Sequence, residues 1–269
     1  MAPKSFWKGY LKLSLVTCRV SMTPATTDNE KIQFHTLNRK THNRLTSRYV
    51  DAETGDVVDD DDEVKGYERA DGDYVLLEDD EIDAVALEST RTIDIEMFVP
   101  DDSVRWIWYD RPHYLLPDDA VGEEAFSVIR EAMRSTGKFG IARLVMYRRE
   151  RAVMLVPSGR GIILWTLRYG DEVRDPAEYF GDIDREKADS KLLKLVKEVI
   201  EERSTSWDPD MVTDPVQEKL ADIIAAKKKG RKRPAKVKAQ TEAPAVDNVI
   251  DIMDALRKSI ASEKKSGKR

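Results

Sequence analysis

The sequence has very little cysteine and histidine, and this scarcity removes several classes of functional site. Cys18 is the only cysteine in 269 residues, which excludes an intramolecular disulfide and a cysteine-based zinc site. The three histidines, His35, His42 and His113, form neither an H-E-x-x-H nor an H-x-E metal motif. Cys18 lies in an apolar run, so we expect a buried, inert thiol rather than a nucleophile. The sequence predicts no bound metal and no cofactor.

Long apolar runs and nucleotide-binding motifs are also missing. No stretch approaches the roughly 18 consecutive apolar residues of a membrane-spanning helix, and the N-terminus lacks the apolar region of a signal peptide. There is no Walker A or G-x-S-x-G motif, and the glycine-containing run at 158–161 lacks the Lys-Ser/Thr that follows in a phosphate loop. We therefore expect a cytoplasmic protein that is not an enzyme and has no membrane partner.

Charge is distributed very unevenly along the chain. Residues 227–269 contain 14 basic and 5 acidic residues, a net charge of +9, whereas residues 1–226 contain 31 basic and 46 acidic residues, a net charge of −15. Such a tail is typical of an arm that binds a polyanion, with nucleic acid as the expected ligand; the alternative is a solvated, solubilising terminus. Its densest part has eight cations and no acid: Lys227, Lys228, Lys229, Arg231, Lys232, Arg233, Lys236 and Lys238.

Two further basic clusters lie within the acidic body. Residues 31–49 contain five cations and no acid, and residues 51–63 contain eight acids and no base, with a turn expected at 54–56. This pattern suggests a protruding ribbon with a basic and an acidic limb. The basic side chains of 31–49 either contact phosphate or are simply solvated. The second basic cluster lies at 143–151, and its arginines either contact phosphate or pair with carboxylates of the body. The candidate DNA-binding residues of the two clusters are Arg39, Lys40, Arg44, Arg48, Arg143, Arg148, Arg149 and Arg151.

Apolar patterning predicts a mainly β body with α elements. Alternation or apolar runs indicate strands over 10–20, 91–99, 104–109, 142–147, 152–156 and 162–169. Pro112 is expected to end the third of these, and 157–161 reads as a hairpin turn. Several short strands joined by turns favour a barrel or a sandwich.

Helical periodicity appears once inside this body and then dominates after residue 189. A helix is expected over 123–135 with Gly137 as its C-cap, a second over 189–203, and a third that begins at Asp214 with a capping-box Gln217. We therefore divide the chain into a β core at 1–188, a helical subdomain at 189–229, a flexible basic linker at 230–245, and an amphipathic helix with a basic terminus at 246–269.

Nine short strings, in order over roughly residues 5–225, give the sequence a specific resemblance. They include Phe6-Trp7-Lys8-Gly9-Tyr10, the strings at 32–37 and 63–68, and those at 109–115, 140–143 and 167–173. These strings resemble bacterial Ku, the family of DNA-end-binding proteins of non-homologous end joining. The resemblance implies a twisted β-barrel with long β arms, whose homodimer forms a ring around double-stranded DNA entered from a free end.

The resemblance also assigns regional roles and partners. It places residues 39–48 in a bridge over the DNA, residues 143–151 near the channel, and the protein on the nucleoid. It further implies recruitment of an ATP-dependent, multifunctional repair ligase of the ligase D type. Two departures stand out: Leu13-Ser14-Leu15-Val16 and Cys18-Arg19-Val20 replace the Phe-Gly-Leu-Val and Ile-Pro-Val of many relatives, which leaves Arg19 without a role.

Three functions follow from these observations. The first is non-enzymatic binding of DNA ends by a homodimer. The second is a nucleoid-type DNA-binding protein that acts mainly through its basic tail. The third is a DNA-processing enzyme that uses a lysine Schiff base at a damaged end.

Overall fold

The computed structural model describes residues 5–28, 31–85, 87, 91–183 and 189–229. These fall into two compact units: the second begins at Tyr179 and also includes Lys31–Gln33. The four-part division predicted from the sequence stays a prediction. The expected linker at 230–245 and the amphipathic helix with its basic terminus at 246–269 lie outside the described residues. So do five of the tail cations: Arg231, Lys232, Arg233, Lys236 and Lys238.

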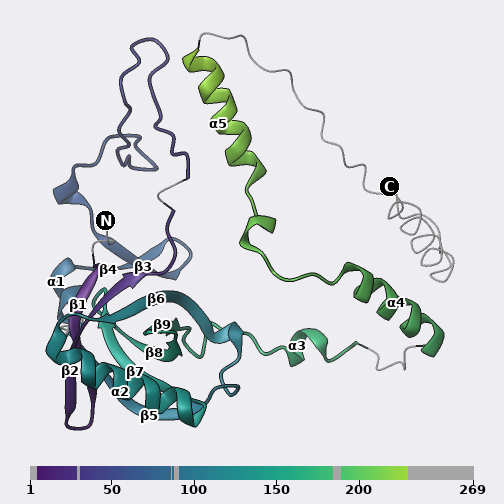
Figure 1. The fold of residues 1–269 in the computed structure, drawn as a ribbon. Helices are drawn as coiled ribbons and strands as arrows, with labels where there is room; N and C mark the ends of the chain where they lie inside the picture. Colours follow the sequence, from purple (N-terminus) through teal and green to yellow (C-terminus); the bar gives the residue numbers. More distant parts are fainter. Residues whose placement is uncertain (1–4, 29–30, 86, 88–90, 184–188, 230–269) are drawn as a thin grey trace. The chain divides into compact units, whose positions relative to one another are not determined.

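Seven strands of the first unit close into a barrel in the order β1-β2-β6-β9-β8-β7-β5 (Figure 1). All neighbours are antiparallel except β1 and β5, which pair in parallel with Tyr10 opposite Thr92. This confirms the predicted barrel. The strands are β1 (Trp7–Leu13), β2 (Val16–Pro24), β5 (Thr92–Pro100), β6 (Tyr109–Pro117), β7 (Lys138–Met146), β8 (Arg149–Ser158) and β9 (Gly161–Leu167).

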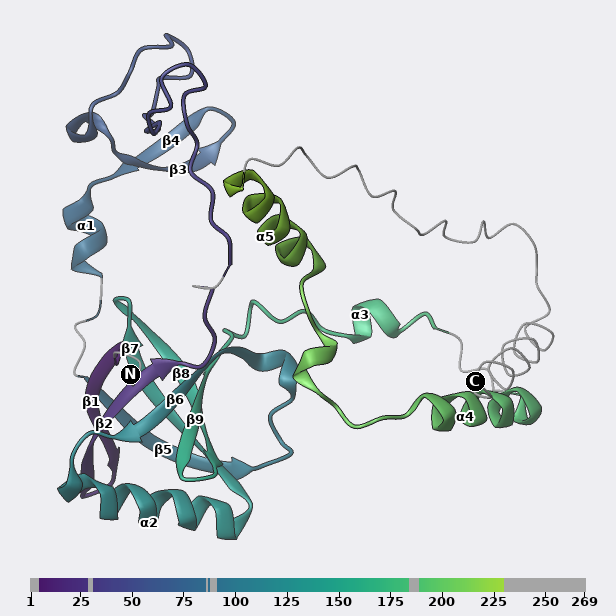
Figure 2. The same cartoon turned by 45° about the horizontal axis from the view of Figure 1, so that its top comes forward.

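The barrel interior and one helix share a single hydrophobic core. Helix α2 (Ala120–Thr136) runs across one end of the barrel (Figures 1 and 2) and contributes Phe126, Ile129 and Met133 to that core. Asp119 caps the helix by accepting a 2.6 Å hydrogen bond from Gly122 N, and the first helical residue, Ala120, lies three residues before the predicted start. The predicted C-cap is confirmed, because Gly137 is left-handed with φ 60°. The inward-facing side chains of the strands include Leu11, Val20, Ile93, Leu115, Leu144, Val153, Leu155 and Leu164.

Two of the predicted strands were wrong in detail. The stretch at 10–20 is a hairpin, in which β1 ends at Leu13 and β2 begins at Val16, with Ser14 in the left-handed region at φ 55°. The stretch at 104–109 is mostly a 3₁₀ turn (Trp106–Trp108). Strand β6 then runs through Pro112 instead of ending there. A register shift between Tyr109 and Pro112 accommodates the proline, which has no N–H to give to the ladder.

Two tight hairpins connect the strands β7, β8 and β9. The one predicted at 157–161 is confirmed, since Ser158 pairs with Gly161 and Gly159 has φ 54°. The β7–β8 turn was not predicted. It consists of Tyr147 and Arg148, which both have positive φ although neither is glycine or asparagine.

The segment between β2 and β5 forms a small sheet of its own. Strands β3 (Lys65–Ala70) and β4 (Asp73–Leu77) make a two-stranded ribbon without a buried residue (Figure 2), followed by the short helix α1 (Asp79–Ala84). The acidic and basic limbs do not form the continuous ribbon that we expected. The basic stretch closes its own loop, in which Asn38 N donates to Asn43 O at 2.8 Å, and the expected turn at 54–56 closes another around Gly55, φ 76°.

The second unit is helical, as the sequence predicts. Helix α4 (Ser190–Arg203) is capped by Asp189 and helix α5 (Pro215–Lys228) by Asp214; the short α3 (Ala177–Phe180) precedes them. Gln217 does not close a capping box, because its Oε1 accepts a hydrogen bond from Ile32 N at 2.8 Å. No helix in the described parts of the chain is both long enough and apolar enough to cross a membrane.

Candidate nucleic-acid interface

The basic cluster of the loop at 37–48 is exposed and unpaired. Asn38 Oδ1 accepts the backbone N–H groups of Lys40 and Thr41, which fixes the turn and leaves the basic side chains outside it. No ion pair joins Arg39, Lys40, Arg44 or Arg48 to any residue that the structure describes. These four cations are therefore available to an external polyanion.

The arginines of the barrel differ from the loop cations because most of them form ion pairs within the chain. Arg143 lies 2.9 Å from Glu150 and 3.3 Å from Glu96, and hydrogen bonds to these two carboxylates raise the pKa of its guanidinium. Arg148 lies 2.6 Å from Asp83. Intramolecular pairing, the alternative to phosphate contact, thus engages three of the four arginines: Arg143, Arg148 and, more loosely, Arg151. Arg149 is exposed and forms no ion pair with a described residue.

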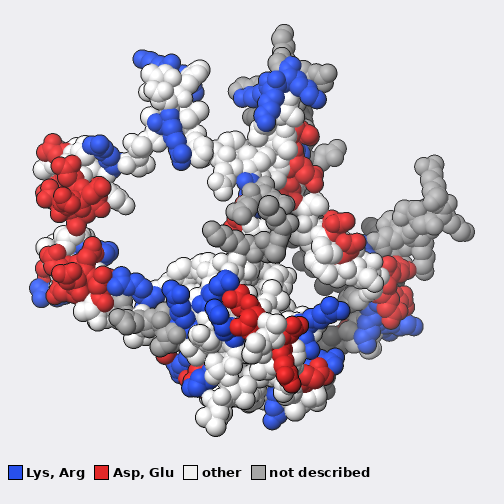
Figure 3. All heavy atoms as spheres, turned by 60° about the vertical axis from the view of Figure 1, so that its left-hand side comes forward, with Lys and Arg blue, Asp and Glu red and all other residues white. Residues whose placement is uncertain are grey.

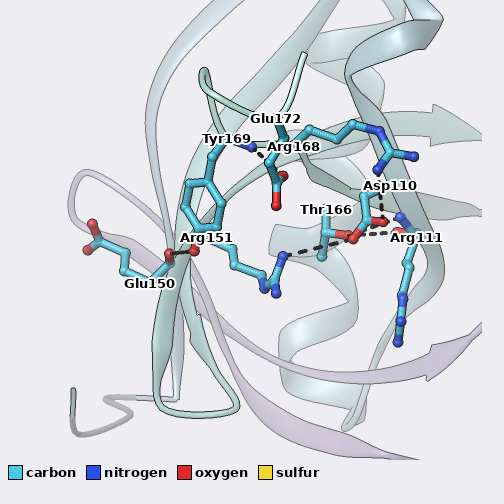
Figure 4. A network of polar contacts seen from close by, with 8 residues as sticks. All are labelled: Asp110, Arg111, Glu150, Arg151, Thr166, Arg168, Tyr169 and Glu172. Carbon is cyan, nitrogen blue, oxygen red and sulfur yellow. Dashed lines mark hydrogen bonds and ion pairs between the residues drawn. The ribbon is translucent and has the colours of Figure 1, made fainter. Parts of the chain in front are cut away.

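Arg151 belongs to a polar network on the barrel (Figure 4). Its side chain extends from the Tyr169 ring, which lies 5.7 Å away, toward Asp110, and its Nη1 is 3.9 Å from Asp110 Oδ2. Arg168 approaches the same carboxylate from the other side, with Nη1 3.8 Å from Oδ1. The buried Thr166 donates to Asp110 Oδ2 at 3.1 Å and accepts from Arg111 N at 3.0 Å.

His113 lies next to this network and is only 5% exposed. Burial lowers the pKa of its imidazole, and backbone groups of Arg111 and Leu164 oppose that shift only in part. Its Nδ1 has no hydrogen-bond partner in the described structure. Burial thus favours the neutral form of this packed histidine. No group of three or more metal-ligating side chains occurs within the described residues.

The comparisons with known proteins decide the family. Residues 12–195 match the Ku70/Ku80 beta-barrel domain. The chain belongs to the Ku family. It is 61% identical to the non-homologous end joining protein Ku of Methylocella silvestris, over all of this chain and 99% of the relative. It is 56% identical to that of Gluconacetobacter diazotrophicus, over 98% of this chain and 99% of the relative, and 33% identical to that of Coxiella burnetii, over 100% and 98%. The resemblance to bacterial Ku is confirmed.

Arg19, which departs from the pattern of many Ku sequences, has a structural partner. Its Nε lies 3.8 Å from Asp119 Oδ2, the carboxylate that caps α2, and its carbonyl accepts a hydrogen bond from Asp118 N at 3.0 Å. Arg19 therefore helps to hold the start of the helix that closes the barrel.

The described part of the basic tail is the last turn of α5. Lys227 and Lys228 lie in that turn and Lys229 is its C-cap, where positive charge favourably opposes the negative end of the helix dipole. No ion pair with a described residue engages them. In Figure 3, Lys and Arg side chains gather in some places and Asp and Glu side chains in others, and over the barrel the two kinds lie side by side.

The sequence did not single out Arg111 and Arg168. Arg111 lies within β6, which was not predicted as a strand, and Arg168 directly follows β9; no charge run marks either residue. Only the strand order β6-β9-β8 brings them beside Arg151.

Proposed function

We propose that the chain binds the ends of double-stranded DNA as a ring-shaped homodimer without sequence specificity. It protects and bridges breaks and recruits an ATP-dependent, multifunctional repair ligase. It does this on the nucleoid, in the cytoplasm, and without catalysis of its own. The observation that carries the proposal is full-length similarity to relatives called non-homologous end joining protein Ku.

The charges of the described residues support binding to phosphate rather than to bases. The loop cations Arg39, Lys40, Arg44 and Arg48 carry no intramolecular partner among the described residues, and neither do Lys227–Lys229. Phosphate contacts are independent of sequence and depend strongly on salt. The acidic remainder of the chain repels DNA from other faces, so the negative net charge is compatible with DNA binding.

The β3–β4 ribbon supports self-association. All its residues are exposed, including Tyr67, Tyr74 and Leu76, and an isolated two-stranded ribbon is marginally stable in water. Exposed apolar side chains gathered in this way mark an interaction surface. A second copy of the chain would cover both ribbons by the same symmetric contact. We expect a particle of twice the 30.7 kDa chain mass in analytical ultracentrifugation, and a monomer at all concentrations would contradict the homodimer.

Comparison of linear and covalently closed circular DNA of the same sequence tests the central proposal. A ring that is threaded from an end binds the linear duplex tightly and the circle weakly. Binding can be measured by gel shift at one fixed salt concentration. Equal affinity for the two forms would refute entry from an end.

A tail variant of the full chain distinguishes end binding by the ring from the nucleoid-type alternative, in which the basic tail is the main DNA-binding element. Replacement of the eight cations between Lys227 and Lys238 by Gln should leave the preference for linear DNA intact. It should reduce the slope of log K against log salt by up to about 7 for each subunit, at about 0.9 for each phosphate contact. Complete loss of binding would instead favour the tail as the main DNA-binding element.

A further inference from the structure

A cavity of about 760 Å³ opens on the barrel beside the network of Arg151. Its polar wall includes Asp110, Arg111 and Arg151, and its apolar wall includes Pro24, Met146 and Tyr147. Pockets that hold small organic ligands combine apolar walls with a few fixed polar groups and have about this size, roughly 300–1,000 Å³.

Arg151 lines this cavity, and its hydrogen-bond donors are not used by the described residues. Its side chain is only 25% exposed, yet it makes no hydrogen bond to any residue described in the structure. Its contacts are the Tyr169 ring and the Asp110 carboxylate, which at 3.9 Å is too distant for a hydrogen bond. A guanidinium that is largely removed from water with unused donors is suited to a bidentate contact with anionic oxygens.

The Asp110 carboxylate beside Arg151 is shared with other donors. Arg151 and Arg168 share this one carboxylate, which also accepts the Thr166 hydroxyl. The cavity lining contains two guanidinium groups, Arg111 and Arg151, and two carboxylates, Asp28 and Asp110. The charges of the lining therefore balance, and preference for an anionic group rests on the unused donors of Arg151.

Tyr147 supplies an aromatic surface to the lining of the cavity. It is 67% exposed and left-handed at φ 53°, and the next residue, Arg148, has φ 63°. Such two-residue turns normally contain Asn and Gly, and left-handed conformations of larger residues cost about 1–3 kcal/mol each unless the surroundings impose them.

Three contacts impose the conformation of this turn. The Phe6 ring lies 5.7 Å from the Tyr147 ring, Asp83 pairs with Arg148, and Leu87 N donates to Arg148 O at 3.2 Å. The result is a fixed, exposed aromatic ring at the edge of a cavity that contains an arginine with free donors. Aromatic rings in this position stack on unpaired nucleobases.

We propose that this cavity binds an unpaired nucleotide through its 5′-phosphate, with the phosphate at Arg151 and Arg111 and the base against Tyr147. A base within a duplex has both faces stacked and cannot lie against this ring. The nucleotide is either free or the unpaired 5′-terminal residue of a DNA strand. The second source rests on the proposed function.

Titration of the full-length chain with dAMP, followed by isothermal calorimetry, tests the site. Wild type should bind saturably. Arg151→Gln should weaken binding about tenfold or more, because a charge-assisted hydrogen bond is lost. Tyr147→Ala should weaken dAMP about fivefold or more through lost stacking, and should leave binding of inorganic phosphate unchanged. The control Arg134→Gln, on α2 and paired with Glu131, should bind dAMP as wild type does.

Thermal melts identify a variant that does not fold, and Arg151→Lys then replaces Arg151→Gln because it keeps the charge but not the planar pair of donors. Three results would overturn the proposal: no saturable binding of dAMP by wild type, equal affinity for dAMP and inorganic phosphate, or an equal loss in Arg134→Gln.

Competition with DNA identifies the source of the nucleotide. A 5′-phosphorylated duplex with one unpaired 5′ nucleotide at each end should displace dAMP, and a blunt duplex should not. If both duplexes bind but neither displaces dAMP, the cavity serves a free nucleotide and the DNA-end source is refuted. If dAMP binds and neither duplex does, the proposed end-binding function fails while the nucleotide site stands.

Discussion

Neutralising the four loop cations should weaken the salt dependence of DNA binding more, per charge, than neutralising the paired arginines Arg143 and Arg148. The perturbation replaces Arg39, Lys40, Arg44 and Arg48 by Gln. None of them forms an ion pair with a described residue, so each is free to displace a counterion from DNA. At about 0.9 for each phosphate contact, the slope of log K against log salt should fall by about 3.6 for each subunit that contacts DNA.

The paired barrel arginines Arg143 and Arg148 provide the matched comparison. Carboxylates of Glu150, Glu96 and Asp83 hold them, so a phosphate contact must first replace an existing ion pair. The double variant Arg143→Gln/Arg148→Gln should therefore change the slope by clearly less than the roughly 1.8 expected for two free cations.

Fluorescence anisotropy of a short, labelled linear duplex between about 50 and 200 mM salt gives both slopes. An unchanged slope in the four-residue variant would show that the loop does not contact phosphate. An equal change per charge in the two variants would show that intramolecular ion pairs do not limit phosphate contact, and the reasoning from pairing would be wrong.

Three further changes test the structure of the barrel itself. Asp119→Ala removes the acceptor of Gly122 N and should lower the free energy of unfolding in urea by about 1 kcal/mol, whereas Asp119→Asn should cost less; equal losses would argue against the cap. Gly9→Ala places a Cβ 2.1 Å from Arg91 O and should lower the melting temperature measured by circular dichroism, while an unchanged value would contradict the close approach. Burial lowers the pKa of His113, so the unfolded chain binds a proton more readily than the folded chain. The free energy of unfolding should be highest above the ordinary histidine pKa of about 6.5 and should fall as the pH decreases below that value. His113→Gln should flatten the stability curve in that range, and an identical curve would exclude His113 as the cause.

The strands of the barrel could largely be predicted because most of them alternate between core and surface; the pattern left a barrel or a sandwich, and the resemblance to Ku favoured the barrel. Ile93 and Ile95 point inward as the pattern required, and the helix caps Asp189, Asp214 and Gly137 carry their usual signals. The turn at Ser14 could not be predicted, because alternation continues through it and no glycine, proline or asparagine marks it. Pro112 within β6 was missed since a register shift cannot be read from one strand alone.

The candidate site was predictable as a set of charges but not as a set of contacts. The runs at 39–48 and 227–238 are visible in the sequence, because local density of charge is a local property. The pairing of Arg143 with Glu96 depends on strand order, and that of Arg148 with Asp83 on where α1 meets the β7–β8 turn. The same order brings Asp110, Arg151 and Arg168 together from three strands and their ends, which leaves no mark in the sequence.

Because β1 and β5 pair directly with each other, the stability of the barrel depends little on the length of the segment that carries the β3–β4 ribbon. Tyr10 of β1 lies opposite Thr92 of β5. The segment between β2 and β5 is therefore one long loop, whose two ends are brought together when the barrel closes. The entropic cost of closing a loop rises only with the logarithm of its length, about 0.6 kcal/mol for each doubling. Insertions or deletions in that segment therefore cost the barrel little, and its length can be set by function rather than by folding stability.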